Sequence, residues 1–115
     1  MRRGDLWWAN LGAHRPLEQT GRRPVVVWQS DALNRVLQSV LVVPLTTNLD
    51  RARLAGTAIV AASDDGLPTD SVALAFQMRA IPKSALDTRI RSLSESELAE
   101  LELATDEALG RVEPD

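Results

Sequence analysis

The sequence contains no cysteine and one histidine, His14. Without thiols the chain can form no disulfide, has no thiol nucleophile, and cannot build a zinc site on thiolates. One histidine cannot supply a multi-histidine metal centre, and the carboxylates do not follow a recognisable metal-binding loop pattern. We therefore expect neither a metal ion nor a cofactor.

The chain also lacks a long hydrophobic run. The longest apolar stretch, Val40–Leu45, has the length of a buried strand and is far too short to span a membrane. The basic amino terminus is not followed by the apolar stretch of a signal peptide, because Asn10, His14 and Arg15 interrupt it. These absences predict a cytoplasmic protein that makes no membrane contact.

The length and composition fit a single folded domain covering residues 1–115. The chain is 44% hydrophobic and 25% charged, which is typical of a folded protein with one core. Its net charge of −3 argues against non-specific binding to nucleic acid. The charges are unevenly distributed, however, since basic clusters dominate before Ala55 and acidic residues crowd the last quarter. This asymmetry predicts a basic working face and an acidic carboxy-terminal helix.

Short apolar or β-branched segments recur through the first 81 residues and are separated by turn residues. The expected strands are Leu6–Ala9, Pro24–Gln29, Val40–Thr47, Gly56–Ala61, Ser71–Phe76 and Gln77–Ile81. A cap-and-turn signal at Ser30–Asn34 predicts one helical turn. The segment from Gly12 to Gly21 has no periodicity and reads as a loop between strands.

The carboxy-terminal region carries a strong helix signal. Ser94 and Glu97 have the spacing of a capping box, in which each side chain binds the backbone amide of the other residue. Apolar residues then recur at helical spacing until Gly110, a plausible stop. Five to seven short strands followed by one helix predict a mainly β (α+β) fold, either an antiparallel sheet or a small barrel.

Three polar segments adjoin the predicted strands: Glu18–Pro24, Pro44–Asn48 and Asp70–Arg79. Taken singly, each could be a solvated loop, a strand end or a sheet edge. Their chemistry nevertheless includes arginines, hydroxyls and amides, which are the groups that bind phosphates and bases.

Six stretches occur in series along nearly the whole chain. They are Arg3–Leu11, Glu18–Val27, Gln29–Asn34, Val43–Asn48, Asp70–Leu74 and Gln77–Ile81. In this order they resemble the MazF/PemK family of toxin ribonucleases. The resemblance implies a small SH3-like antiparallel barrel of five to seven strands with a C-terminal helix, the CcdB/PemK-like fold. It also implies a homodimer that cleaves single-stranded messenger RNA sequence-selectively and without a metal ion, and a cognate antitoxin as protein partner.

The resemblance assigns catalysis to Arg23, Thr46 and Glu18. The planar fork of a guanidinium suits two phosphate oxygens and can stabilise the charge of a transition state, but it holds its proton too tightly to be a good base. We therefore expect Arg23 to stabilise charge, Thr46 to hydrogen-bond a phosphate oxygen, and Glu18 to accept the proton of the attacking ribose 2′-hydroxyl.

Further polar residues of these segments could contact the bases or backbone of single-stranded RNA. They are Gln19, Arg22, Gln29, Thr47, Asn48, Gln77 and Arg79. Trp7 and Trp8 should lie on opposite faces of their strand. Either could stack on a base, although packing in the core or in a dimer interface is the favoured interpretation for at least one of them. His14 is better read as an ordinary loop residue.

Two other functions are compatible with the same fold. One is a toxin that binds DNA gyrase without enzymatic action, and the other is a non-catalytic barrel that binds RNA. The presence of both Arg23 and Thr46 favours the ribonuclease over either alternative.

Overall fold

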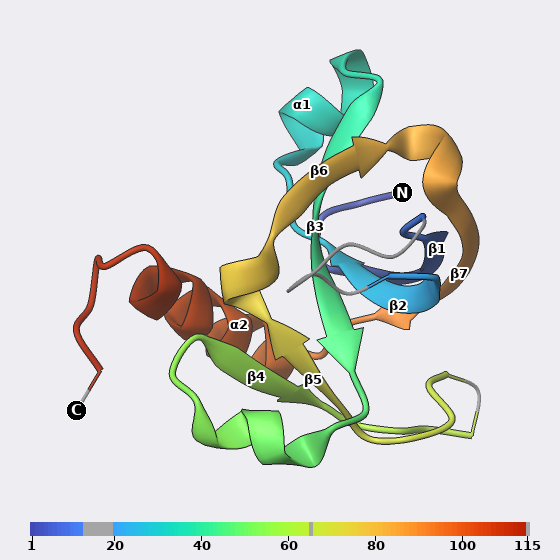
Figure 1. Ribbon diagram of the computed structural model, residues 1–115. Coiled ribbons are helices and arrows are strands. Elements are labelled where there is room, and N and C mark those ends of the chain that lie inside the picture. The colour runs from blue at the N-terminus through green and yellow to red at the C-terminus, as the bar shows by residue number, and fades with distance from the viewer. Residues whose placement is uncertain (13–19, 65, 115) are drawn as a thin grey trace.

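The computed structural model describes every residue except 13–19, 65 and 115. The described residues form one curved antiparallel sheet with a long helix against it (Figure 1). The strands are β1 (Asp5–Asn10), β2 (Arg22–Val27), β3 (Ser39–Thr46), β4 (Thr57–Val60), β5 (Ser71–Leu74), β6 (Arg79–Pro82) and β7 (Leu86–Ser92). The α-helices are α1 (Asp31–Val36) and α2 (Glu95–Ala108), and the 3-10 helices are η1 (Leu49–Arg53), η2 (Ala75–Gln77) and η3 (Lys83–Ala85).

Strand β3 organises the sheet, whose order is β4-β5-β3-β2-β1-β7 with β6 also beside β3. The first half of β3 pairs with β6, and its last two residues, Leu45 and Thr46, pair with β5. Pro44 lies between these two stretches, so its missing amide hydrogen interrupts neither ladder.

The sheet has a hydrophobic cluster on each face. Along β2, Val26 packs in the cluster that includes Leu101 of α2, whereas Val25 and Val27 pack in the other cluster with Val42 of β3. All five side chains are buried, and their alternation follows the two-residue repeat of a strand. A core on both faces explains why β2 and β3 are continuous apolar runs in the sequence.

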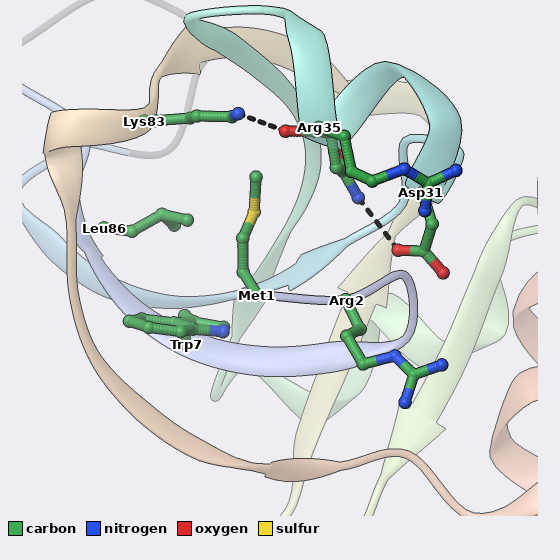
Figure 2. Close-up of a pocket in the computed structure, with 8 residues that line it drawn as sticks. Met1, Arg2, Trp7, Asp31, Arg35, Lys83 and Leu86 are labelled. Carbon is green, nitrogen blue, oxygen red and sulfur yellow. Dashed lines mark hydrogen bonds between the residues drawn. The ribbon is translucent and has the colours of Figure 1, made fainter.

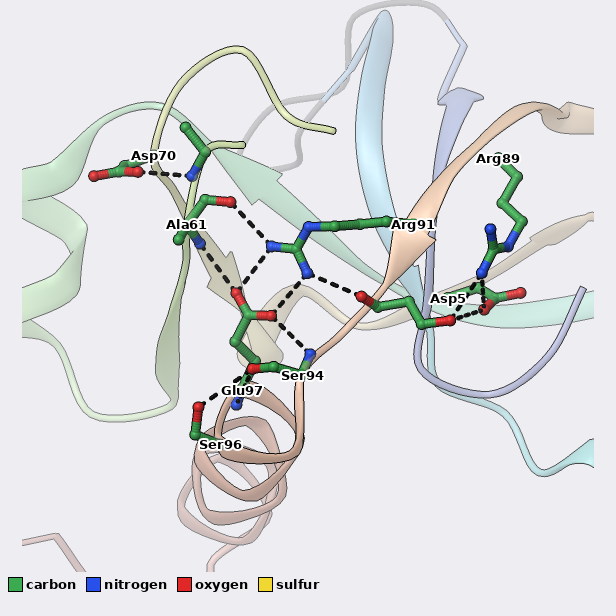
Figure 3. Close-up of polar contacts among 10 residues, drawn as sticks. Asp5, Ala61, Asp70, Arg89, Arg91, Ser94, Ser96 and Glu97 are labelled. Atoms are coloured by element: carbon green, nitrogen blue, oxygen red, sulfur yellow. Dashed lines mark hydrogen bonds and ion pairs between the residues drawn. The ribbon is translucent and has the colours of Figure 1, made fainter. Parts of the chain in front are cut away.

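Helix α2 begins with the predicted capping box. The Ser94 hydroxyl accepts from the Glu97 amide, and the Glu97 carboxylate accepts from the Ser94 amide. The same carboxylate pairs with Arg91 of β7 at 2.8 Å and accepts the Ala61 amide at 3.0 Å (Figure 3). Glu97 therefore joins the start of α2 to β7 and to the residue that follows β4.

The predicted strands and helix are present, with shifts of a few residues at their ends. The structure adds β7, which the sequence did not predict because polar and charged residues dominate it and most of its side chains are exposed. The expected turn at Ser30–Asn34 extends to the six-residue α1, capped by the Ser30 hydroxyl. In the part of the chain that the structure describes, neither α-helix is long and apolar enough to cross a membrane.

Candidate active site

The sheet register brings the two expected catalytic residues level with each other. Strand β2 pairs with β3 antiparallel, with Val25 opposite Pro44. Arg23 stands two residues before Val25, and Thr46 stands two residues after Pro44. The pairing ends at Val25 and Pro44, and two residues beyond this pair the same register aligns Arg23 with Thr46 at the same end of neighbouring strands.

Arg23 is half-buried and held at one point. Its Nε donates to the carbonyl of Thr20 at 2.9 Å, which fixes the plane of the guanidinium. Among the described residues, its two terminal amino groups make no hydrogen bond. An arginine anchored through Nε presents the other two nitrogens as a fork, which is the geometry that binds two phosphate oxygens.

Thr46 is buried, with 9% of its surface exposed. Its Oγ1 accepts the backbone amide of Asn48 at 3.2 Å, so the hydroxyl oxygen is oriented by the chain itself. The hydroxyl proton can then be donated to an acceptor such as a phosphate oxygen.

A pocket of about 200 Å³ opens beside Arg23, and we refer to it as the Arg23 pocket. Its lining residues are Trp8, Arg22, Arg23, Pro24, Thr47, Leu67, Pro68, Thr69 and Ser71. Thr46 is not among these residues, whereas its chain neighbour Thr47 is. The segment Leu67–Thr69 was not predicted to belong to the site, because its sequence shows only a turn region between two strands.

Arg22 makes two contacts at the rim of the Arg23 pocket. Its guanidinium pairs with Asp87 of β7 at 2.8 Å and lies 4.5 Å from the centre of the Trp8 ring. The hydrogen bond from Arg22, followed by that from Thr88, lowers the pKa of the exposed Asp87 carboxyl. The charge of Arg22 is thus largely offset, which leaves Arg23 as the cation of this pair that has a fork to offer a ligand.

The base of the β1–β2 loop adjoins the Arg23 pocket. The Leu11 amide donates to the carbonyl of Gly21, and the Gly21 amide donates to the carbonyl of Gly12. Both glycines have positive φ, 85° at Gly12 and 75° at Gly21, and this backbone conformation closes the loop base directly before Arg22. The predicted site residues Glu18 and Gln19 lie outside the described residues, as does His14.

Gln29 has a structural role in place of the expected RNA contact. It is buried, with 4% of its surface exposed. Its Nε2 donates to Asn34 Oδ1 at 3.0 Å and to the Ser39 carbonyl at 3.1 Å, while its Oε1 accepts the Leu41 amide at 3.3 Å. Because its amide is engaged within the fold, Gln29 joins α1 to the start of β3 and does not face a base.

Three other expected RNA-contacting residues lie outside the Arg23 pocket. Asn48 is exposed and caps η1 through the Asp50 amide. Gln77 ends η2 and is half-buried. Arg79 donates to the Leu11 carbonyl at 2.9 Å and lines a separate pocket of about 400 Å³ together with Leu11 and Gly12 of the loop base. Arg22, Arg23 and Thr47 therefore share the Arg23 pocket, the continued β2–β3 register aligns Thr46 with Arg23, and the remaining described candidates do not line this pocket.

Comparison with known proteins gives a consistent result. Residues 2–109 match the family described as PemK-like, MazF-like toxin of type II toxin-antitoxin system. Endoribonuclease MazF of Staphylococcus epidermidis is 34% identical over 110 residues, covering 96% of this chain and 92% of that protein.

Solved structures share the fold. MazF (Form-I) from Deinococcus radiodurans has a TM-score of 0.80 at 24% identity and covers 96% of each chain. An endoribonuclease in complex with its cognate antitoxin from mycobacterial species also has a TM-score of 0.80, at 23% identity and with 99% of each chain covered. These similarities confirm the predicted architecture of antiparallel strands followed by a C-terminal helix.

Proposed function

Because the chain belongs to the PemK-like, MazF-like family of toxins of type II toxin–antitoxin systems, we propose that it is an endoribonuclease that cuts single-stranded RNA at the Arg23 pocket. The observation that carries the assignment is the juxtaposition of Arg23 and Thr46 through the β2–β3 register. A guanidinium fork and an oriented hydroxyl at one strand end are the two donors that a phosphodiester needs.

The proposed reaction uses the RNA's own nucleophile. The ribose 2′-oxygen attacks the adjacent phosphorus, the bond from phosphorus to the 5′-oxygen breaks, and the products are a 2′,3′-cyclic phosphate and a 5′-hydroxyl end. The 2′-hydroxyl proton is removed by a base, for which Glu18 is our candidate, and the departing 5′-oxygen takes up a proton. Arg23 and Thr46 bind the non-bridging oxygens, on which negative charge grows in the transition state.

The wall of the Arg23 pocket supplies contacts beyond the phosphate. Trp8 presents an aromatic surface on which a base can stack, at about 1–3 kcal/mol per base in single-strand binders. Thr47 and Thr69 offer hydroxyls to base edges. We assign sequence selectivity to these three side chains, together with Gln19 of the loop.

The same proposal includes the setting in which the enzyme acts. We propose a cytoplasmic homodimer whose two protomers join their basic surfaces into one RNA-binding groove, which compensates for the net charge of −3. Its regulator is a cognate antitoxin, the kind of partner present in the solved mycobacterial complex.

Incubation of the purified protein with single-stranded RNA in the presence of a chelator tests this function. We expect cyclic-phosphate ends from the wild type, and a loss of at least about 100-fold in rate for Arg23→Ala, since removal of one charge-stabilising donor costs about 10²–10³ in rate. Arg53→Ala is the matched control, because Arg53 is exposed on η1 and does not line the Arg23 pocket. Intact RNA combined with trapping of DNA gyrase would instead establish the non-enzymatic alternative.

A further inference from the structure

A carboxylate of β7, Asp87, pairs with the first of the two arginines that line the Arg23 pocket. Asp87 Oδ2 accepts from Nε of Arg22 at 2.8 Å, and Oδ1 accepts from one of its terminal nitrogens at 3.4 Å. The Arg22 guanidinium also lies 4.5 Å from the centre of the Trp8 ring. Arg22 is therefore held by a two-point ion pair and by a cation–π contact.

An irregularity in the sheet gives Asp87 its position. Where β1 pairs with β7, Trp8 is opposite Thr88 and Ala9 is opposite Leu86, so Asp87 is an extra residue between the two pairs. A β-bulge of this kind redirects side chains, and bulges are over-represented beside active sites. The position of the Asp87 carboxylate thus depends on a specific feature of the β1–β7 pairing.

The residues at the bulge serve two different parts of the molecule. Leu86 lines, together with Trp7, a separate pocket of about 480 Å³ (Figure 2). Asp87 instead reaches Arg22, and the Thr88 hydroxyl donates to Asp87 Oδ1 at 2.6 Å. Because Thr88 orients the carboxylate, the ion pair has a defined geometry although both of its side chains are exposed to solvent.

The two arginines of the pocket consequently differ in what they offer to an RNA backbone. The terminal nitrogens of Arg23 make no hydrogen bond among the described residues, so its charge is open to a phosphate. The charge of Arg22 is balanced by Asp87, although its side chain is 53% exposed. The ion pair, and not burial, therefore keeps Arg22 from acting as a second phosphate-binding cation.

We propose that Asp87 is a positioning residue that withholds Arg22 from the RNA backbone and thereby limits how tightly the Arg23 pocket holds any single strand. Arg22 stays with Asp87 when RNA binds, so Arg23 neutralises the phosphate and contacts to the bases supply the rest of the affinity. An exposed ion pair contributes little to folding stability, which favours this role over a purely structural one. The proposal rests on the ribonuclease function proposed above, because it concerns the same pocket.

Fluorescence anisotropy with a labelled single-stranded oligodeoxynucleotide tests this proposal, because a strand without 2′-hydroxyls binds without being cut. Titrations between about 50 and 200 mM salt give the slope of log affinity against log salt concentration. Asp87→Asn frees Arg22, so we expect the affinity to rise about two- to fivefold. The slope should steepen by about 0.7, the value for one more phosphate contact on a single strand. Asp87→Glu keeps the charge and should bind like the wild type, whereas loss of a merely structural carboxylate would not tighten binding.

Two further variants identify the cause of the change. Asp87→Asn/Arg22→Gln removes both charges of the pair, and we expect affinity and slope to return to the wild-type values because no cation is freed. Glu102→Gln is the matched control, since Glu102 pairs with Arg3, which lies 3.9 Å from the centre of the Trp28 ring. The same three kinds of group thus meet at residues that do not line the proposed RNA site, and we expect unchanged binding.

Unchanged affinity and slope in Asp87→Asn would overturn the proposal. Tighter binding that persists in Asp87→Asn/Arg22→Gln would also overturn it, because the effect would then be repulsion between the carboxylate and the strand. Failure of the wild type to bind the oligonucleotide would overturn it as well. The ribonuclease function is judged separately by the chelator assay above, and only uncut RNA in that assay would overturn it.

Discussion

Replacement of Glu97 should destabilise the protein in a pH-dependent way. Burial raises the pKa of this carboxyl, but hydrogen bonds from Arg91, Ser94 and Ala61 and the charge of Arg91 outweigh burial and lower the pKa from 4.5 to about 2. Since each tenfold change in proton affinity corresponds to about 1.4 kcal/mol, the ionised Glu97 contributes up to about 3 kcal/mol to the free energy of unfolding. This side chain is 12% exposed, so solvent screening is limited.

The sign of the pH dependence follows from the lowered pKa. The contribution of Glu97 is complete above pH 4.5, falls to about half at pH 3, and is lost as the pH drops through about 2. Urea unfolding followed by far-ultraviolet circular dichroism should show Glu97→Gln less stable than wild type by about 2–3 kcal/mol at pH 7, with the difference shrinking towards pH 3. Glu102→Gln is the control, because Glu102 pairs with Arg3 on the surface and should change stability by less than about 1 kcal/mol. A difference that is equal at pH 7 and pH 3 would refute this reasoning.

Three further outcomes are expected. Thr46→Val keeps the shape of the side chain but removes its hydroxyl, and it should slow RNA cleavage at least about 100-fold. Thr46→Ser keeps the hydroxyl and should retain most of the activity. Gel assays of RNA cleavage measure both effects. Gln29→Ala should lower the free energy of unfolding by about 1–3 kcal/mol, because it leaves the buried groups that Gln29 binds without hydrogen bonds. The KM for RNA should not change. A raised KM without loss of stability would contradict the structural role of Gln29. Arg22→Ala should reduce cleavage less than Arg23→Ala, because Asp87 already offsets its charge; equal losses in the same assay would disprove this ranking.

The parts of the fold that local chemistry determines could be predicted from the sequence. Ser94 and Glu97 define the start of α2 within a few residues, and the valines of β2 and β3 identify two buried strands. Strand β7 could not be predicted, because only Leu86 and Ile90 of its residues pack against the hydrophobic clusters and its position depends on pairing with β1. Its pairing includes two register shifts, around Trp7 and Trp8, that no local pattern encodes.

The candidate site shows the same division. The resemblance to the MazF/PemK family identified Arg23 and Thr46 as candidates. Their alignment, however, depends on the β2–β3 register, which is a non-local property. The prediction for Gln29 failed because polarity alone does not distinguish a ligand-facing amide from one that satisfies buried backbone groups. Leu67 and Thr69 enter the Arg23 pocket from a distant connection, and sequence patterns do not report such long-range contacts.

The three tryptophans can serve as intrinsic fluorescent probes of different parts of the molecule. The sequence has three, and each occupies a different environment: Trp8 lines the Arg23 pocket, Trp7 lines a separate pocket of about 480 Å³, and Trp28 is buried with its N–H bonded to Thr105 of α2. Indole emission responds to local polarity and quenching, so variants that keep one tryptophan each would follow three events separately. One variant would then follow a nucleic acid entering the Arg23 pocket, another would follow changes on the opposite face of β1, and the third would follow the detachment of α2 from the sheet.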